Sequence, residues 1–275
     1  MPERIRRLLP NLKSVLNFRR LVAGAILLPF ASAALAGWDT LNMPVGVTEV
    51  SRIVYDLHML IFWICVVIGI VVFGAMFYSI LMHRKSRGVT AATFHESTTV
   101  EVIWTVIPFI ILVAMAVPAT ATLIKMEDSG QSEMTIKITG YQWLWRYDYL
   151  DHDFGFYSFL STSRDSIRDR AEKGEHYLLE VDRPLVIPTN TKIRLLVTAN
   201  DVIHAWWVPD LALKRDAIPG FINELWTQID DPGVYRGQCA ELCGRDHGFM
   251  PIEVHAVPPD EYRAWVEKQT ASVAE

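Results

Sequence analysis

The 275-residue sequence has only three cysteines, too few for the disulfide framework of a small secreted domain. Its hydrophobic content of 51% excludes a disordered chain, and its composition also excludes a collagen. There is no internal repeat, no low-complexity tract and no Cys-x-x-Cys-His motif, so no c-type haem is attached to this chain. The length allows one or two domains.

Residues 125–275 lack the excess of Lys and Arg that is typical of a nucleic-acid-binding domain. Residues 125–275 hold 16 Lys and Arg against 25 Asp and Glu, a net charge of −9, whereas residues 1–124 hold 10 against 6, a net charge of +4. The acidic balance of the second part argues against nucleic acid as a partner. The apolar residues gather in the first part. The chain is therefore expected to join a membrane-embedded N-terminal part to an acidic polar domain.

Residues 1–36 have the composition of a secretory signal peptide. A leader with six Lys and Arg precedes the apolar stretch from Leu21 to Leu35, and the sequence around Ala34 and Ala36 forms a small-x-small cleavage site. A retained membrane anchor is the alternative, but about 15 apolar residues fall short of the roughly 20 needed to span a bilayer. We expect cleavage after Ala36 and a mature chain outside the cytoplasm.

Two longer apolar runs, residues 57–82 and 102–123, have 26 and 22 residues and no formal charge. Both reach the length of a membrane span, and two buried helices of a soluble protein are the alternative. The link between them, residues 83–101, begins with a cluster of three cations, Arg84, Lys85 and Arg87. By the positive-inside rule the link is cytoplasmic. Residues 37–124 are therefore expected to form an N-terminal segment and a transmembrane hairpin.

From residue 125 onward the pattern changes to short strands. Met134–Thr139 alternates apolar and polar residues with the period of a half-buried strand. The further β-rich runs, separated by Gly, Pro, Asn and Asp, are Tyr141–Tyr149, Tyr177–Val181, Lys192–Thr198, Glu224–Ile229, Gly233–Gln238 and Ile252–Val257. This spacing predicts an all-β sandwich or barrel over residues 125–258. The run Pro258–Gln269 predicts a terminal helix with Pro at its start, and residues 259–275 are assigned to this C-terminal helix and a tail.

The strongest chemical signal is the run GQCAELCGRDHGFMP, residues 237–251. It supplies two thiols, an imidazole and a thioether, from Cys239, Cys243, His247 and Met250. Soft sulfur and imidazole donors suit copper or zinc far better than magnesium or calcium. A mononuclear electron-transfer copper site needs one Cys, two His and a weak Met, so a second His from a distant strand is required. His204, in the run DVIHAWWVP, is the candidate.

One of the two thiols is surplus for a single copper. Two thiolates can instead bridge two coppers, each capped by one His, with Met250 on one copper and a loop carbonyl on the other. Three alternatives stay open at this stage: a disulfide between Cys239 and Cys243, a structural zinc site, and a membrane-anchored copper chaperone or thiol oxidoreductase. Cys65 lies within the first apolar run and is expected to be a packing residue.

These motifs resemble subunit II of haem–copper cytochrome c oxidases of the bacterial type. The resemblance rests on the cysteine loop, His204, and the runs DAIPG (216–220), GYQWLWRYDY (140–149) and VEVIWT (100–105), and it covers roughly residues 40–258. It implies a transmembrane hairpin followed by a cupredoxin-like β-barrel with the binuclear copper centre called CuA. Such a subunit accepts electrons from cytochrome c and passes them to haem in subunit I, where oxygen reduction is coupled to proton pumping. The quinol-oxidase relative of this subunit keeps the barrel but binds no copper, and the intact set of metal donors argues against that assignment.

By position, the resemblance assigns two copper ions to His204, Cys239, Cys243, His247 and Met250, with Glu241 contributing its backbone carbonyl. The Glu241 carboxylate would reach a magnesium or manganese ion shared with subunit I, which fits the preference of hard cations for oxygen. The implied partners are subunit I, subunit III, cytochrome c and membrane lipid. The implied location is the bacterial inner membrane, with the large domain in the periplasm.

The resemblance also implies roles outside the loop. Trp143 matches the tryptophan through which electrons enter, and ordinary strand packing is the alternative. Glu101 would guard the entrance of a proton pathway, and a helix N-terminal anion is the alternative. The acidic domain would attract a basic cytochrome c. The docking carboxylates are expected near Trp143, on Asp148, Asp151, Asp153 and Asp201.

Overall fold

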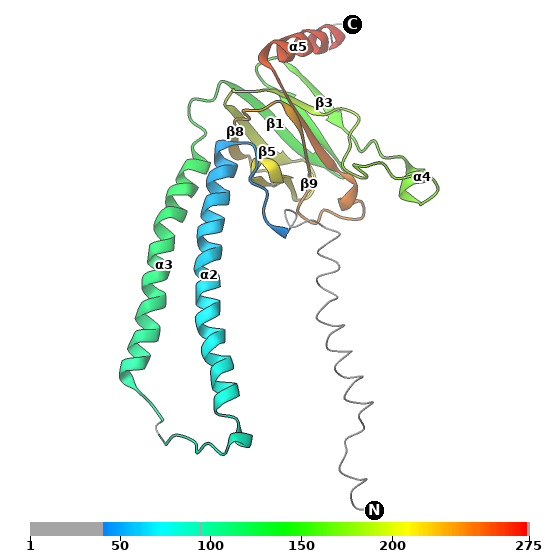
Figure 1. Cartoon of the computed structure of the whole chain (residues 1–275). Coiled ribbons are helices and arrows are strands. Elements are labelled where there is room, and N and C mark those ends of the chain that lie inside the picture. The colour runs from blue at the N-terminus through cyan, green and yellow to red at the C-terminus, as the bar shows by residue number, and fades with distance from the viewer. Residues whose placement is uncertain (1–40, 94, 274–275) are drawn as a thin grey trace, which may run out of the picture. The chain divides into compact units, whose positions relative to one another are not determined.

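The computed structural model describes residues 41–93 and 95–273, so the expected signal peptide lies outside the described residues (Figure 1). The predicted pair of apolar helices is present as α2 (Glu49–Met82) and α3 (Thr98–Glu127). At 1.5 Å per residue, the 34 residues of α2 extend about 51 Å, well beyond the roughly 30 Å of a bilayer core. With 34 and 30 residues, both helices are longer than the apolar runs of 26 and 22 residues that predicted them. A short 3₁₀ turn, η3 (Lys85–Arg87), lies in the link.

The outer turns of both helices contact the β-domain. Thr48 and Ser51 form a reciprocal capping box that starts α2, with bonds of 2.9 and 3.0 Å. Arg52, one residue further along, pairs with Asp230 of the β-domain. At the end of α3, the Lys125 carbonyl accepts a 3.1 Å hydrogen bond from the indole of Trp226. An ion pair and a side-chain-to-backbone hydrogen bond thus join the apolar helices to the polar domain.

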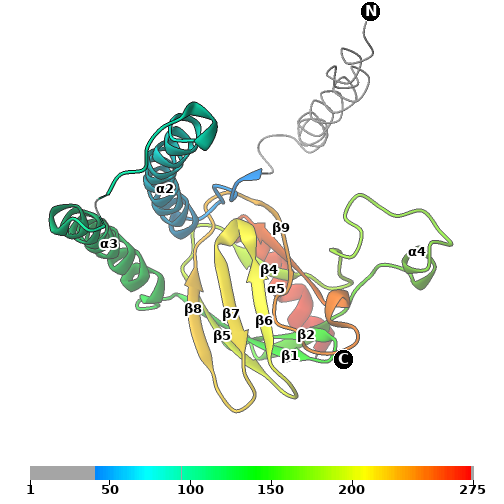
Figure 2. The ribbon, with the colours of Figure 1, turned by 90° about the horizontal axis from the view of Figure 1, so that it is seen from below.

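The β-domain consists of two five-stranded sheets (Figures 1 and 2). The first has the order β3-β2-β1-β5-β8, with β1 (Met134–Tyr141), β2 (Leu144–Tyr149), β3 (Phe154–Ser158), β5 (Ile193–Ala199) and β8 (Asn223–Thr227). The second has the order β4-β10-β9-β6-β7, with β4 (Leu185–Pro188), β6 (His204–Val208), β7 (Leu213–Ala217), β9 (Gly233–Cys239) and β10 (Pro251–Val257). The pairs β1–β5 and β4–β10 are parallel. Both sheets bury side chains in one hydrophobic core, so the expected β-sandwich or barrel is confirmed.

Two strand predictions are corrected. The run Tyr141–Tyr149 is a tight hairpin rather than one strand, because the chain reverses at Gln142 and Trp143 between β1 and β2. The run Tyr177–Val181 is not a strand, because it begins in a turn and pairs only through one isolated bridge from Val181 to Leu160. The missed strands include β4, in which all four residues are buried. A strand buried on both faces has no polar alternation for the sequence pattern to reveal.

Two further elements complete the domain. Helix α5 (Pro259–Val273) is the predicted C-terminal helix, and its Trp265 packs 5.3 Å from the ring of Tyr149 on β2. A long excursion, residues 159–184, carries the short helix α4 (Arg164–Ile167) and projects from the sheets (Figure 2). Helix α5 thus covers one end of β2. The opposite end, at Trp143, borders the loop between β9 and β10.

Candidate metal centre

The predicted metal donors meet at one end of the second sheet. His204 begins β6 and Cys239 ends β9, and these neighbouring strands pair through Trp206 and Cys239. The connection from β9 to β10 then folds back over that end. It carries the remaining donors, and one of them, His247, lies in the 3₁₀ turn η5 (His247–Phe249). Sheet pairing therefore brings together a histidine and a loop that lie about 35 residues apart in the sequence.

His204 and the two cysteines form the centre of the cluster. One donor atom from each of His204, Cys239 and Cys243 lies within 4.8 Å of the others. The Cys239 Sγ atom lies 3.9 Å from His204 Nδ1 and 3.9 Å from the Cys243 Sγ atom. All three side chains are buried. The Cys239 thiol is therefore the neighbour of one imidazole and of the second thiol.

The other predicted donors complete the cluster on either side. The Cys243 Sγ atom lies 3.4 Å from His247 Nδ1 and 3.5 Å from Met250 Sδ. The Glu241 carbonyl lies 3.4 Å from the Cys239 Sγ atom. The six positions singled out in the sequence thus gather at one place. The Glu241 carboxylate is on an exposed residue of the same loop.

Packing keeps water away from the central donors. His204, Cys239, Cys243 and Met250 are 0%, 4%, 3% and 1% exposed. The ring of Trp145 meets the His204 imidazole edge-on at 5.9 Å. A Cβ atom at Gly140 would lie 2.8 Å from His204 Cδ2, so only glycine lets β1 approach the imidazole this closely. A dry, stiff surrounding favours a metal centre whose geometry changes little.

The cluster is built for a soft metal rather than for a disulfide. The sulfur atoms of Cys239 and Cys243 stand 3.9 Å apart, against about 2.05 Å in a disulfide. Five side-chain donors and a carbonyl exceed the four ligands of a structural zinc site, and zinc makes little use of thioether sulfur. Two thiols, two imidazoles and a thioether match the preferences of copper. The residues present therefore fit copper.

Asp201 holds the His204 ring in place, a role that was not predicted from the sequence. Its carboxylate lies 2.9 Å from His204 Nε2, which leaves Nδ1 directed at the cysteines. The same carboxylate accepts 2.7 Å hydrogen bonds from the backbone N–H groups of Gln142 and Val202. Partial burial opposes ionisation of Asp201, but these hydrogen bonds hold its pKa below the usual value. An acid three residues before a candidate ligand histidine was the available signal.

The two thiols differ electrostatically. Burial disfavours both thiolates, but the hydrogen bond with His204 and the nearby backbone groups lower the pKa of Cys239. Burial and the neighbouring Cys239 raise the pKa of Cys243. Without a cation, Cys239 therefore ionises more readily than Cys243. A bound cation offsets the repulsion between the two sulfurs and favours both thiolates.

Trp143 lies against the metal loop. The side-chain amide of Gln142 donates a 2.8 Å hydrogen bond to the Cys243 carbonyl, which joins the β1–β2 turn to a predicted ligand. A Cβ atom at Gly244, where φ is +120°, would lie 3.2 Å from Trp143 Cζ2. The guanidinium of Arg245 lies 5.5 Å from the centre of the Trp143 ring. The role of Trp143 was predicted from the sequence, whereas the contact made by Gln142 was not.

The predicted docking acids divide into two places. Asp201 lies beside the Gln142–Trp143 turn. Asp148 pairs with Arg146 towards the far end of β2, and Asp151 accepts a hydrogen bond from the backbone of Thr135 beyond that end. Asp153 lies in the β2–β3 turn with a φ of +54°. Three of the four acids therefore lie about a strand's length from Trp143. Glu101 lies in the first turn of α3, where the helix dipole favours an anion.

Comparison with known proteins agrees with this arrangement. Residues 134–257 match a family model described as cytochrome c oxidase subunit II, periplasmic domain, and residues 36–121 match the transmembrane domain of the same subunit. A probable cytochrome c oxidase subunit 2 of Rickettsia prowazekii is 39% identical over 237 residues, covering 86% of this chain and 74% of the relative. The chain belongs to the cytochrome c oxidase subunit II family.

Other members of the family are similarly close. Cytochrome c oxidase subunit 2 of Branchiostoma floridae is 42% identical over 193 residues, covering 70% of this chain and 81% of that protein. The solved periplasmic domain of subunit II of cytochrome oxidase from Bradyrhizobium japonicum is 41% identical, covers 52% of this chain and 98% of that one, and has a TM-score of 0.47.

Family membership establishes the role of the chain. A subunit II takes electrons from cytochrome c into an oxidase complex, and the chain is a subunit of a cytochrome c oxidase. The His/Cys/Cys cluster supports copper binding, and the two apolar helices anchor an extramembrane domain in a membrane. The copper-chaperone and thiol-oxidoreductase alternative is not favoured.

Proposed function

We propose that the cluster holds two copper ions bridged by the thiolates of Cys239 and Cys243. The observation that carries this proposal is the pairing of each thiol with its own imidazole. His204 lies beside Cys239, and His247 lies beside Cys243. The Glu241 carbonyl lies on the Cys239 side and Met250 on the Cys243 side. One pair of donors is thus available for each of two metals.

Bound copper would supply a one-electron carrier whose charge is shared across both thiolates. The chain's own residues keep this carrier dry and fixed. The buried side chains around His204 exclude water, and Asp201 orients the imidazole. A rigid, water-free surrounding reduces the rearrangement that accompanies gain or loss of an electron. The subunit would therefore pass electrons rapidly without holding substrate.

Electrons would enter through Trp143 and leave on the His247 side, towards haem in subunit I. Trp143 is joined to the metal loop through Gln142 and the Cys243 carbonyl, which is the contact that supports this role. The docking acids would attract a basic cytochrome c from Asp148, Asp151, Asp153 and Asp201. Long-range attraction between opposite charges raises association rates even when the acids lie apart from the contact point.

Two further carboxylates are assigned roles beside subunit I. The exposed Glu241 would direct its carboxylate to a magnesium or manganese ion shared with that subunit. Glu101, in the first turn of α3, would stand at the entrance of a proton pathway. The complex would include subunits I and III in a bacterial inner membrane, with residues 125–258 in the periplasm and residues 1–36 removed as a signal peptide.

The copper stoichiometry tests the proposal directly. The full chain is purified in detergent and loaded with copper, its metal content is determined, and its EPR spectrum is recorded. We expect two coppers per chain and one unpaired electron shared equally between them. Cys243→Ser should abolish the shared signal, whereas Cys65→Ser, which removes an exposed cysteine of α2, should leave it unchanged. One copper with a localised signal in the unaltered chain would overturn the proposal.

A further inference from the structure

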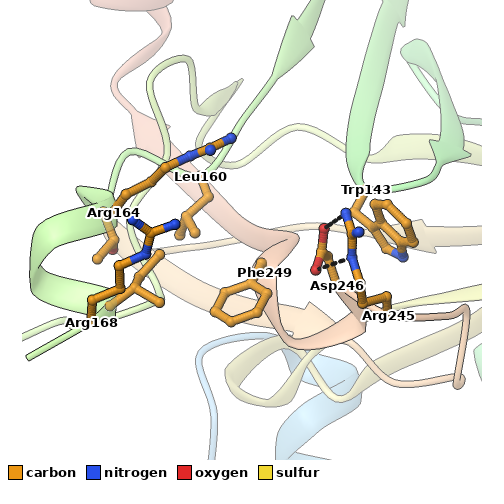
Figure 3. Close-up of a pocket in the computed structure, with 9 residues that line it drawn as sticks. Trp143, Leu160, Arg164, Arg168, Arg245, Asp246 and Phe249 are labelled. Carbon is orange, nitrogen blue, oxygen red and sulfur yellow. Dashed lines mark hydrogen bonds and ion pairs between the residues drawn. The ribbon is translucent and has the colours of Figure 1, made fainter.

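A cavity of about 440 Å³ opens beside Trp143, between the metal loop and the excursion that carries α4 (Figure 3). Trp143 and Arg245 lie on one side of it, Arg164 and Arg168 lie on the other, and Phe249 lies between them. Its size is within the range of small-molecule sites. None of the six proposed copper ligands lines it.

The cavity is cationic, although the domain as a whole is acidic. Three guanidinium groups line it, and Asp246 is the single carboxylate among the lining residues. Arg245 already pairs with Asp246, through bonds of 3.1 and 3.0 Å. Among residues 41–93 and 95–273, no ion pair or side-chain hydrogen bond involves Arg164 or Arg168. Arg164 interacts with Asp246 only through longer-range electrostatics. Two guanidinium groups are therefore available to a ligand.

The remaining walls are aromatic or apolar. The rings of Trp143 and Phe249 and the side chains of Leu160 and Ile167 contribute them. Flat apolar walls favour a ring, and guanidinium groups at the rim favour carboxylate or phosphate oxygens, which they bind in a bidentate manner. Thr162 adds a hydroxyl that can donate or accept a hydrogen bond. This combination selects against cations and against neutral apolar molecules.

We propose that this cavity is a binding site for a small organic polyanion with an aromatic body and at least two carboxylate or phosphate groups. Arg164 and Arg168 bind the anionic groups, and the ring packs against Phe249. The site is separate from the copper ligands, so its occupancy requires no metal. Because Trp143 forms one wall, an occupant would also cover the proposed point of electron transfer. That last consequence rests on the proposed function, whereas binding itself does not.

The test uses two tricarboxylates of equal charge. Trimesate carries three carboxylates on a benzene ring, and tricarballylate carries them on a propane chain. Calorimetric titration of the full chain in detergent, without copper and at a pH where both are fully ionised, should show one trimesate site per chain. Tricarballylate should bind several-fold more weakly, because it lacks the ring. Benzoate, with the ring and one charge, should also bind more weakly than trimesate.

Arginine variants locate the site. In Arg164→Gln/Arg168→Gln, trimesate affinity should fall about tenfold, since two exposed ion pairs are lost. Arg170→Gln is the matched control, because this exposed cation lies in the same excursion and does not line the cavity. Circular dichroism checks that the variants fold. Absence of saturable trimesate binding, equal binding of the two tricarboxylates, or an equal loss in Arg170→Gln would overturn the proposal.

Discussion

The two ends of strand β2 differ in charge, in packing and in what they contact. At its start, Trp143 lies against the metal loop and lines a cavity together with three arginines. Towards its other end, Asp148 is followed by the acidic turn that holds Asp151 and Asp153, and Tyr149 packs on helix α5. Six residues of strand separate these ends by about 17 Å. A cavity rich in arginine at one end of β2 thus lies about a strand's length from an acidic turn at the other end.

This difference shows that the net charge of the domain does not describe the surface around Trp143. The value of −9 for residues 125–275 predicts attraction of a basic partner from a distance. Around the cavity that Trp143 lines, however, Arg164, Arg168 and Arg245 outnumber Asp246. We therefore assign the attraction of a basic partner to the acidic end of β2 and its close contact to the Trp143 end. Substitutions at the acidic end should change the association rate, and substitutions at the Trp143 end should change electron transfer.

The largest effect is expected at the metal end, from Asp201→Asn. The amide keeps the size of the side chain but loses the charge that supports the His204 imidazole at 2.9 Å. Loss of a group that orients a ligand typically lowers metal affinity by about 10- to 100-fold. Copper affinity is measured by competition with a chelator of known affinity. Asp231→Asn, at an exposed turn away from the cluster, is the control. An unchanged affinity would show that Asp201 acts only as a surface charge.

Trp143→Phe should separate electron transfer from copper binding. Phenylalanine retains a ring against Gly244 but is smaller and less readily oxidised, so reduction of the centre by cytochrome c should slow at least tenfold, or about 1.4 kcal/mol in the barrier. The copper EPR spectrum should stay unchanged. Trp265→Phe makes the same substitution at the α5 end of β2 and should leave the rate unaltered. Equal slowing in both variants would mean that electron entry does not depend specifically on the Trp143 end of β2.

Gln142→Leu should loosen the contact between Trp143 and the loop. The variant removes the 2.8 Å hydrogen bond to the Cys243 carbonyl, and one such bond contributes about 1 kcal/mol to stability. We expect that decrease in the free energy of unfolding by denaturant, together with a few-fold slower electron transfer. Gln238→Leu, at an exposed position of β9, is the matched control. A rate unchanged in Gln142→Leu would show that this hydrogen bond does not couple the turn to the centre.

The donor types and the overall architecture could be predicted from the sequence because they depend on local patterns. Long uncharged runs predict α2 and α3, and the spacing of Cys239, Cys243, His247 and Met250 predicts a soft metal site. The position of His204 beside the loop required the pairing of β6 with β9, a non-local contact. It was inferred from the missing ligand rather than from any pattern near it.

What the sequence could not predict depends on which side chains tertiary contacts bring together. Asp201 was grouped with the docking acids, yet its carboxylate faces His204, and three of those acids lie at the opposite end of β2. Arg164 and Arg168 lie about 80 residues from Arg245 in the sequence, so their shared cavity had no sequence signature. Charge was predictable as a total, whereas its distribution depends on the fold.

The smallest effect is expected at the acidic end, from Asp153→Asn. Asparagine tolerates the positive φ of this turn position as well as aspartate does, so the backbone should be unstrained. Losing one exposed charge some distance from Trp143 should lower the association rate with a basic cytochrome c by about twofold at low salt, and by less as salt screens the field. Asp231→Asn removes an equal charge from the β8–β9 turn. Stopped-flow rates across ionic strength distinguish the two. If both variants slowed equally, only net charge would matter; a larger loss in Asp153→Asn would assign attraction to the acidic end of β2.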